Sequence, residues 1–257
     1  MNMRKESEMF DRMSEYYDKF RPDYPEKVID TIVNIAGLTK GSRILEIGAG
    51  SGKATSQFVD YDFEMLCLDP GADLVRIGNE RFKGKNILFT KARFEEYDLP
   101  LEYYDAVISG QAFHWIPKPL GYELCSKTLK PGGWLMPFWN IELIDETPLD
   151  RELLQIFERY NAFTATINVH DYKKRVTSIR DSIESSGLFK DIDVINVKHC
   201  RTYTADEYFG YIMTGNIFVQ NPTELKKECY NKLLEIADKY GNIRRDFICE
   251  LYVARKI

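Results

Sequence analysis

Short apolar runs alternate with helix-like segments along the first half of this chain. The runs that predict strands lie at residues 43–47, 65–68, 86–90, 106–109 and 134–139. The segments that predict helices between them lie at residues 54–59, 72–82 and 119–129. Apolar strands that alternate with helices are typical of a mostly parallel sheet with helices on both faces. The pattern therefore predicts an α/β fold.

The flanking regions follow a different pattern. Two helices are expected before this block, at residues 6–20 and 25–36, with prolines between them. Two more are expected after it, at 148–160 and 172–186, separated by a polar, irregular stretch. We expect this later region to form a helical cap over the open edge of the sheet. The remaining predicted elements are a strand at 192–197, a helix at 224–240 and a last strand at 247–254.

The sharpest chemical feature is a glycine loop after the first predicted strand. Glu46 enters the loop, and Gly48, Gly50 and Gly52 follow it. Glycines let the backbone turn tightly against a ligand, and open parallel sheets bind ligands beyond the carboxyl ends of their strands. A dinucleotide fingerprint would need a glycine where this chain has Lys53. A carboxylate at position 46 would repel a pyrophosphate but suits a ligand that carries ammonium and sulfonium charges. The alternative is that the loop is only a tight turn.

A second carboxylate follows the second predicted strand. Asp69 stands where the carboxyl end of that strand meets the glycine loop. In nucleotide-binding folds an acidic residue at this place accepts hydrogen bonds from ribose hydroxyls. Together, the glycine loop and Asp69 predict a site for a cationic ligand that carries a ribose.

The order of motifs resembles that of the class I S-adenosylmethionine-dependent methyltransferases. The resemblance covers about residues 10–140, with the glycine loop followed by Leu68-Asp69-Pro70 and by residues 104–109 and 129–134. It implies a Rossmann-like, seven-stranded, mostly parallel sheet whose last strand, at 247–254, runs antiparallel. The expected single domain has N-terminal helices over the cofactor (1–36), a cofactor-binding core (37–140), a helical cap or acceptor region (141–190) and final strands and helices (191–257).

The resemblance implies S-adenosylmethionine as the cofactor. It implies that Glu46 sits beneath the methionine moiety and that Asp69 holds the ribose. The other cofactor-binding positions that it implies are Tyr17, Arg21, Gly48, Ala49, Gly50, Gly52, Pro70, Arg93, Phe94, Ser109 and Gln111. Many family members carry an acidic residue where Arg93 stands, so backbone groups of Arg93 and Phe94, or Glu95, are expected to replace that adenine contact. Arg21 would pair with the cofactor carboxylate, or else be a surface charge on an N-terminal helix.

The loop after the fourth predicted strand is the expected acceptor region. It contains His114 and Trp115, which we expect to contact the substrate. His114 is the candidate catalytic base, because its ordinary pKa lies near neutrality; the alternative is that it packs on Trp115 and orients the loop. The run from Gln111 to Trp115 is similar to that of the trans-aconitate methyltransferases, which methylate small carboxylates.

Composition narrows the possible partners. The net charge is −5 with no basic block, which argues against a nucleic-acid partner. No apolar stretch approaches the ~20 residues of a membrane helix, and the five cysteines and three histidines are too scattered to predict a metal site. The N-terminus has no signal-like apolar run, so a cytoplasmic protein is expected. We expect it to be a monomer or a homodimer.

The predicted reaction is methyl transfer from S-adenosylmethionine to a small carboxylate, hydroxyl or phenol by in-line displacement. The alternatives are a non-catalytic S-adenosylmethionine-binding protein and a nicotinamide-dependent oxidoreductase.

Overall fold

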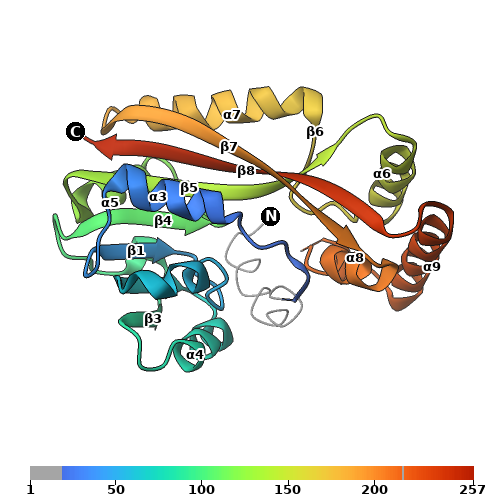
Figure 1. Ribbon diagram of the computed structural model, residues 1–257, viewed down its shortest axis with the longest axis horizontal. Coiled ribbons are helices and arrows are strands. Elements are labelled where there is room, and N and C mark those ends of the chain that lie inside the picture. Colours follow the sequence, from blue (N-terminus) through green and yellow to red (C-terminus); the bar gives the residue numbers. More distant parts are fainter. Residues whose placement is uncertain (1–18, 216) are drawn as a thin grey trace.

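The computed structural model describes residues 19–215 and 217–257, so Tyr17 lies outside the described residues (Figure 1). The strands are β1 (Arg43–Ile47), β2 (Glu64–Asp69), β3 (Ile87–Lys91), β4 (Tyr104–Gly110), β5 (Leu129–Ile144), β6 (Thr166–Asn168), β7 (Phe189–Tyr203) and β8 (Ile243–Lys256). The α-helices are α3 (Glu26–Ala36), α4 (Ala72–Arg81), α5 (Leu120–Thr128), α6 (Pro148–Tyr160), α7 (Val169–Glu184), α8 (Ala205–Ile212) and α9 (Thr223–Tyr240). Short 3-10 helices are η2 (Thr55–Tyr61), η3 (Phe94–Glu96), η4 (Phe113–Trp115) and η5 (Phe218–Gln220).

The strands form one mostly parallel sheet in the order β3-β2-β1-β4-β5-β8-β7. Strands β1 to β5 pair in parallel, whereas β8 runs antiparallel to both β5 and β7. The predicted Rossmann-like sheet with an antiparallel last strand is thus confirmed. One difference is an eighth strand, because the short β6 pairs with the extended end of β5. This strand lies in the polar stretch whose pattern is too short and mixed to indicate a strand.

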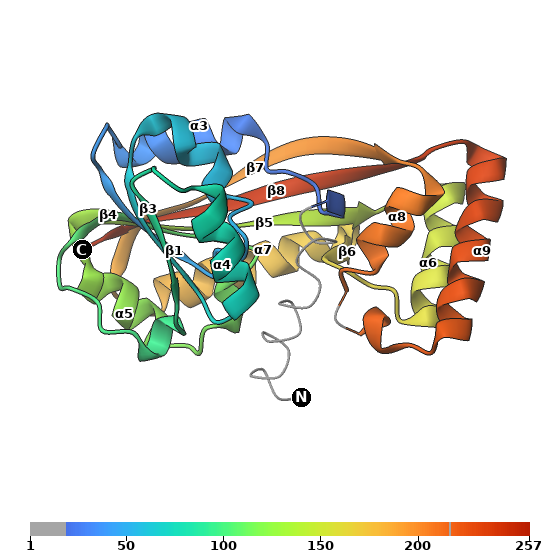
Figure 2. The same ribbon diagram turned by 90° about the horizontal axis from the view of Figure 1, so that it is seen from below.

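Helices cover both faces of the sheet, with α3 on one side and α5 and α7 on the other (Figure 2). Neighbouring strand residues point to opposite faces. Ile44 of β1 therefore packs in the core under α3, while the next residue, Leu45, packs under α5. Because both faces are buried, the inner strands are apolar almost throughout, which is why the sequence pattern located them.

A third core lies where β5, β7 and β8 extend beyond the other strands (Figure 1). Helices α6, α8 and α9 gather at this end. The segment expected to form the cap is divided: α6 belongs to this cluster, whereas α7 lies along the sheet and buries Ile183 in the core under α5. Within the described residues, no helix is both long enough and apolar enough to span a membrane.

A buried ion pair joins the cap helices to the sheet. Arg245 of β8 donates to Glu142 of β5 at 2.6 Å and to Asp150 of α6 at 2.5 Å. Tyr208 of α8 donates to the same Glu142 carboxylate at 2.6 Å. All four side chains are buried. This network therefore fixes where α6 and α8 sit on the strands that lead to the ligand cavity.

Candidate functional site

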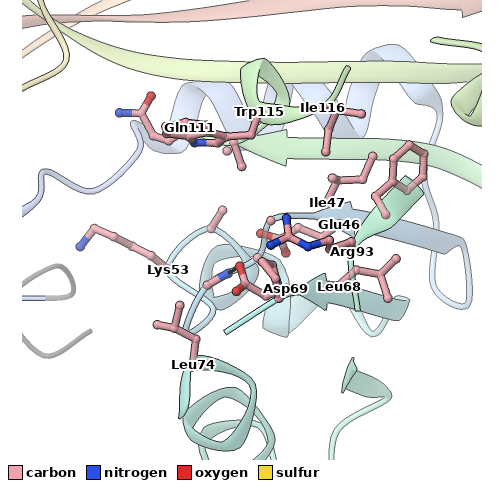
Figure 3. A pocket seen from close by; sticks show the side chains of 18 of the residues that line it. Glu46, Ile47, Lys53, Leu68, Asp69, Leu74, Arg93, Gln111, Trp115 and Ile116 are labelled. Carbon is pink, nitrogen blue, oxygen red and sulfur yellow. Dashed lines mark hydrogen bonds between the residues drawn. The ribbon is translucent and has the colours of Figure 1, made fainter. Parts of the chain in front are cut away.

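A cavity opens at the carboxyl ends of β1, β2 and β4 (Figure 3). It encloses about 1070 Å³ of empty space, its open mouth included. Figure 3 shows Gln111, Trp115 and Ile116 along one wall, and Lys53, Asp69 and Leu74 along the wall opposite. Open parallel sheets bind their ligands at this edge.

The glycine loop borders the cavity, and its three glycines are required for two different reasons. Gly48, Gly50 and Gly52 all have left-handed backbones, with φ of 67°, 60° and 93°. A Cβ on Gly48 would lie 2.2 Å from the Cβ of Ala112, and one on Gly52 would lie 2.4 Å from the ring of Phe82. A Cβ on Gly50 would meet no described atom within 4 Å. Gly48 and Gly52 are therefore needed for packing, whereas Gly50 is needed for its backbone conformation.

The Asp69 carboxylate ties the glycine loop to the loop after β2. One oxygen accepts a hydrogen bond from the backbone N–H of Gly50 at 2.9 Å, and the other accepts one from Gly71 at 2.8 Å. The side chain lines the cavity although the residue is only 7% exposed. Asp69 thus organises the loop and also presents a negative charge to a ligand.

Glu46 lies beneath the glycine loop and is 1% exposed. Its carboxylate accepts hydrogen bonds from the Thr55 hydroxyl at 2.6 Å and from the Cys67 thiol at 3.8 Å. The pKa of Glu46 is raised to about 7, chiefly by burial; the two hydrogen bonds oppose this shift, and the negative charge of Asp69 contributes to it. A cationic ligand in the cavity would stabilise the ionised form.

Comparisons with known proteins place this site in a family. Residues 44–133 match the model of a methyltransferase domain. A methyltransferase of Mycobacterium tuberculosis, itself uncharacterised, is 31% identical over 124 residues, or 48% of this chain and 49% of the relative. A probable S-adenosylmethionine-dependent methyltransferase of Saccharomyces cerevisiae is 32% identical over 131 residues, or 49% of this chain and 44% of the relative. This chain carries a methyltransferase domain at residues 44–133. It spans about half the length of these curated relatives.

Solved structures agree with this assignment at the level of the fold. A type II methyltransferase candidate from Anaeromyxobacter dehalogenans has a TM-score of 0.67 at 18% identity, covering 92% of this chain and 98% of that one. A phosphoethanolamine N-methyltransferase from Haemonchus contortus, solved with phosphomonomethylethanolamine and S-adenosylhomocysteine, has a TM-score of 0.61 at 14% identity. That match covers 100% of this chain and 60% of the other.

Most of the positions predicted to bind the cofactor line the cavity of the methyltransferase domain. They are Glu46, Gly48, Ala49, Gly50, Asp69, Pro70, Arg93, Phe94 and Gln111, together with the predicted acceptor residue Trp115. Gly52 packs against Phe82 instead. Ser109 is fully buried, and its hydroxyl donates to the Ile47 carbonyl at 2.8 Å, which joins β4 to β1.

Arg21 is buried rather than a surface charge. It is 9% exposed, its Nε donates to the Thr214 hydroxyl at 2.7 Å, and its guanidinium lies 5.1 Å from the centre of the Tyr211 ring. It lines a smaller cavity that adjoins the main one and shares Lys53 and Gln111 with it. The guanidinium therefore reaches the neighbourhood of the pocket from the N-terminal side.

Gln111 lies between the two cavities in a strained conformation. Its φ of 61° is left-handed, which is unusual for a residue with a side chain. Its Nε2 donates to the Asn140 carbonyl at 3.0 Å, while its Oε1 is buried without a hydrogen-bond partner among the described residues. Such an acceptor costs about 1–3 kcal/mol until a donor reaches it. Strain and an unsatisfied acceptor together mark Gln111 as a functional position.

His114 lies beside the lining of the cavity rather than within it, although its neighbours Trp115 and Ile116 line it. Its ring centre is 4.8 Å from that of Trp115 and 6.4 Å from that of Trp139. The pKa of His114 is lowered to about 4, chiefly by burial, with a smaller contribution from the positive charges of Arg175 and Lys118. The expected contact between His114 and Trp115 is present.

Several residues that line the main cavity were not among the predicted site positions, and Tyr24, Leu74 and Ile116 are three of them. Tyr24 follows Arg21 in the proline-containing segment, so its neighbourhood, but not its role, was indicated. Leu74 on α4 and Ile116 after η4 have no sequence signal that separates them from ordinary core residues. Among the described residues, no cluster of His, Cys, Asp and Glu could hold a metal ion.

Proposed function

We propose that this protein is an S-adenosylmethionine-dependent methyltransferase that acts on a small molecule. The observation that carries the proposal is the pair of buried carboxylates beside the glycine loop, Glu46 beneath it and Asp69 bonded to Gly50 in its middle. The methionine moiety of the cofactor carries an ammonium beside the sulfonium, and Glu46 offers these cations a negative charge in a low-dielectric site. Asp69 offers hydrogen-bond acceptors to the ribose.

The remaining lining suits the rest of the cofactor. The adenine would lie against Phe94 and the backbone around Arg93, and the cofactor carboxylate would lie toward Arg21 and Lys53. When bound, S-adenosylmethionine supplies a methyl group activated by its sulfonium. The protein's own residues would align the acceptor with that methyl and exclude water.

A small acceptor is supported by the charge and by the site. The net charge of −5 disfavours a nucleic-acid substrate. The phosphoethanolamine N-methyltransferase of Haemonchus contortus has the same fold and was solved with a small-molecule ligand. The sequence favours carboxylates, hydroxyls and phenols as acceptors. Trp115 and Ile116 form the apolar part of the wall that such a molecule would meet.

Calorimetric titration with S-adenosylmethionine, S-adenosylhomocysteine and NAD tests the cofactor. We expect micromolar binding of both adenosyl compounds and none of NAD. Asp69→Ala should weaken adenosyl binding by ~1.5–3 kcal/mol, the range for hydrogen bonds to a charged group. Binding of NAD, or of no adenosyl compound to folded protein, would contradict the proposal. Tight binding without turnover across carboxylates, phenols and amines would favour a non-catalytic S-adenosylmethionine-binding protein.

A further inference from the structure

Residues 19–24, which we call the strap, are held in place chiefly by side chains from distant parts of the chain. Arg201 of β7 donates to the carbonyls of Lys19 and Arg21 at 3.3 and 3.1 Å. Asn140 of β5 donates to those of Pro22 and Asp23 at 3.3 and 3.1 Å. Gln57 of η2 donates to the carbonyl of Tyr24 at 3.0 Å. Five carbonyls of the strap are therefore engaged by three side chains.

The strap forms part of the wall of the ligand site. Tyr24 lines the main cavity, and Arg21 and Pro22 line the smaller one beside it. Lys53 of the glycine loop also pairs with Asp23 at 2.8 Å. A displacement of the strap would therefore open the cavities and remove Arg21 from the site.

Asn140 connects the strap to the loop that follows β4. The residue is 3% exposed, and its backbone carbonyl accepts the hydrogen bond from Gln111 Nε2. Its Oδ1 lies 2.9 Å from Nε2 of His199. Because Nδ2 already donates to two carbonyls, Oδ1 must be the acceptor and His199 the donor. Every polar group of the Asn140 side chain is thus committed, which fixes the orientation of its amide.

The two walls joined by Asn140 are both costly to hold in place. Gln111 keeps its left-handed backbone with its N–H bonded to the Phe138 carbonyl at 2.9 Å and its side chain bonded to Asn140. Pro22 to Tyr24 lie outside any helix or strand, so side chains must satisfy their carbonyls. Removal of the Asn140 side-chain amide would therefore release the strap carbonyls, while the backbone carbonyl that accepts from Gln111 would remain.

We infer that Asn140 is a positioning residue that couples occupancy of the adenosyl site to docking of the strap. A ligand that contacts Tyr24 and Arg21 binds only while the strap is docked. Thermodynamic linkage then requires that ligand binding favours docking by the same factor by which docking raises the affinity of the ligand. The inference rests on the proposed function only for the identity of the ligand. The latch, by which we mean the two hydrogen bonds from the Asn140 amide to the strap, is a property of the unliganded chain.

Limited trypsin digestion tests the coupling, because the Lys19–Phe20 bond lies in the strap and the Lys19 carbonyl is held by Arg201. The Arg21–Pro22 bond resists trypsin, so cleavage after Lys19 reports strap release and can be followed by mass. Saturating S-adenosylhomocysteine should slow this cleavage in the wild type by roughly tenfold. Asn140→Leu, which keeps the branching at Cγ and removes the donors, should speed cleavage without ligand and weaken binding of S-adenosylhomocysteine, each by roughly tenfold, the effect of one or two hydrogen bonds.

Two further variants distinguish release of the strap from a general loss of stability and from the loss of a direct ligand contact. Arg201→Met releases strap carbonyls from a partly exposed position, so it should speed cleavage even if Asn140→Leu proves too unstable to study. Asp69→Ala is the matched control, because it should weaken S-adenosylhomocysteine while cleavage without ligand stays at the wild-type rate.

The inference is overturned if the bound ligand does not protect Lys19–Phe20. It is equally overturned if Asn140→Leu, or Arg201→Met in its place, speeds cleavage without weakening the ligand. Failure of the wild type to bind S-adenosylhomocysteine would instead refute the proposed function. The cleavage rates without ligand would then still show whether Asn140 latches the strap.

Discussion

The indole Nε1 of Trp139 donates a 3.2 Å hydrogen bond to Nδ1 of His114. An indole nitrogen can only donate, so Nδ1 of the imidazole must be the acceptor and the proton of the neutral ring must sit on Nε2. Protonation of Nδ1 would break this bond and add a cation near Arg175 and Lys118. The geometry therefore favours a neutral His114 that accepts this hydrogen bond and orients the loop over one that accepts a proton.

This arrangement predicts that His114 stays neutral well below its ordinary titration range. The pKa of about 4 means that its imidazole should not titrate between pH 5.5 and 8, where an ordinary histidine changes charge. Proton NMR of the ring signals measures this directly, since the chain has only three histidines and His114→Asn assigns the peak. A His114 midpoint near 6.5 would contradict the assignment and restore the general-base hypothesis.

The contact between Gly48 and Ala112 predicts an asymmetry within the glycine loop. Gly48→Ala should destabilise the fold and weaken adenosyl binding by at least tenfold, because its Cβ would lie 2.2 Å from that of Ala112. Gly50→Ala has a similar φ but meets no described atom within 4 Å, so it should cost only the ~1–2 kcal/mol of left-handed strain. Denaturant titration and calorimetry measure both quantities.

A second-site change checks the physical cause. Ala112→Gly removes the opposing methyl group, so it should recover part of the loss in Gly48→Ala but none in Gly50→Ala. Equal effects of the two single substitutions would show that strain alone, rather than the approach of the two loops, makes glycine necessary.

The part of the cavity around the glycine loop could be predicted because its sequence signals are local. Glu46, the glycines and Asp69 each stand at the end of an apolar run, and the ends of parallel strands meet at one edge of a sheet. Periodicity reports which face of an element is buried, and the inner strands are buried on both faces. The parallel sheet and its antiparallel last strand followed from the same pattern and the family resemblance.

The strap and its latch could not be predicted in this way. Asn140 lies in the middle of an apolar strand, and its partners are backbone carbonyls of residues 22 and 23. Backbone carbonyls have no sequence signature, and contact across more than a hundred residues depends on the register of the finished sheet. Ser109 shows that a recognisable motif position does not reveal its bonding partner either. It stands in a motif position, yet its hydroxyl bonds the Ile47 carbonyl, a partner that only the paired strands reveal.

The buried Arg245 predicts a large effect on stability. Arg245→Met would leave the carboxylates of Glu142 and Asp150 buried without their cation, at a cost of about 3–5 kcal/mol. The triple variant Arg245→Met, Glu142→Gln, Asp150→Asn removes the charges together and should recover much of that loss. Urea denaturation of the three proteins tests this, and a single variant within 1 kcal/mol of wild type, less than the usual cost of an unpaired buried charge, would contradict it.

Glu46 predicts a pH-dependent conflict between stability and binding. Its pKa is about 7 in the folded protein against an ordinary 4.5, so between these values the folded state holds a proton that the unfolded state has lost. The free energy of unfolding should therefore fall as pH rises through this window, by about 3 kcal/mol once the carboxyl is ionised. Glu46→Gln cannot ionise, so it should match the wild type near pH 4.5 and be more stable than it at pH 8.

Ligand binding should change in the opposite direction. At pH 8 the wild-type carboxylate can pair with the ammonium of S-adenosylmethionine, whereas the amide cannot, so Glu46→Gln should bind the cofactor about tenfold to a hundredfold more weakly. Denaturation at pH 5 and 8 and calorimetry at pH 8 measure the two effects on the same samples. A variant that is less stable than the wild type at pH 8, or that binds equally well, would show that the buried charge serves the fold rather than the cofactor.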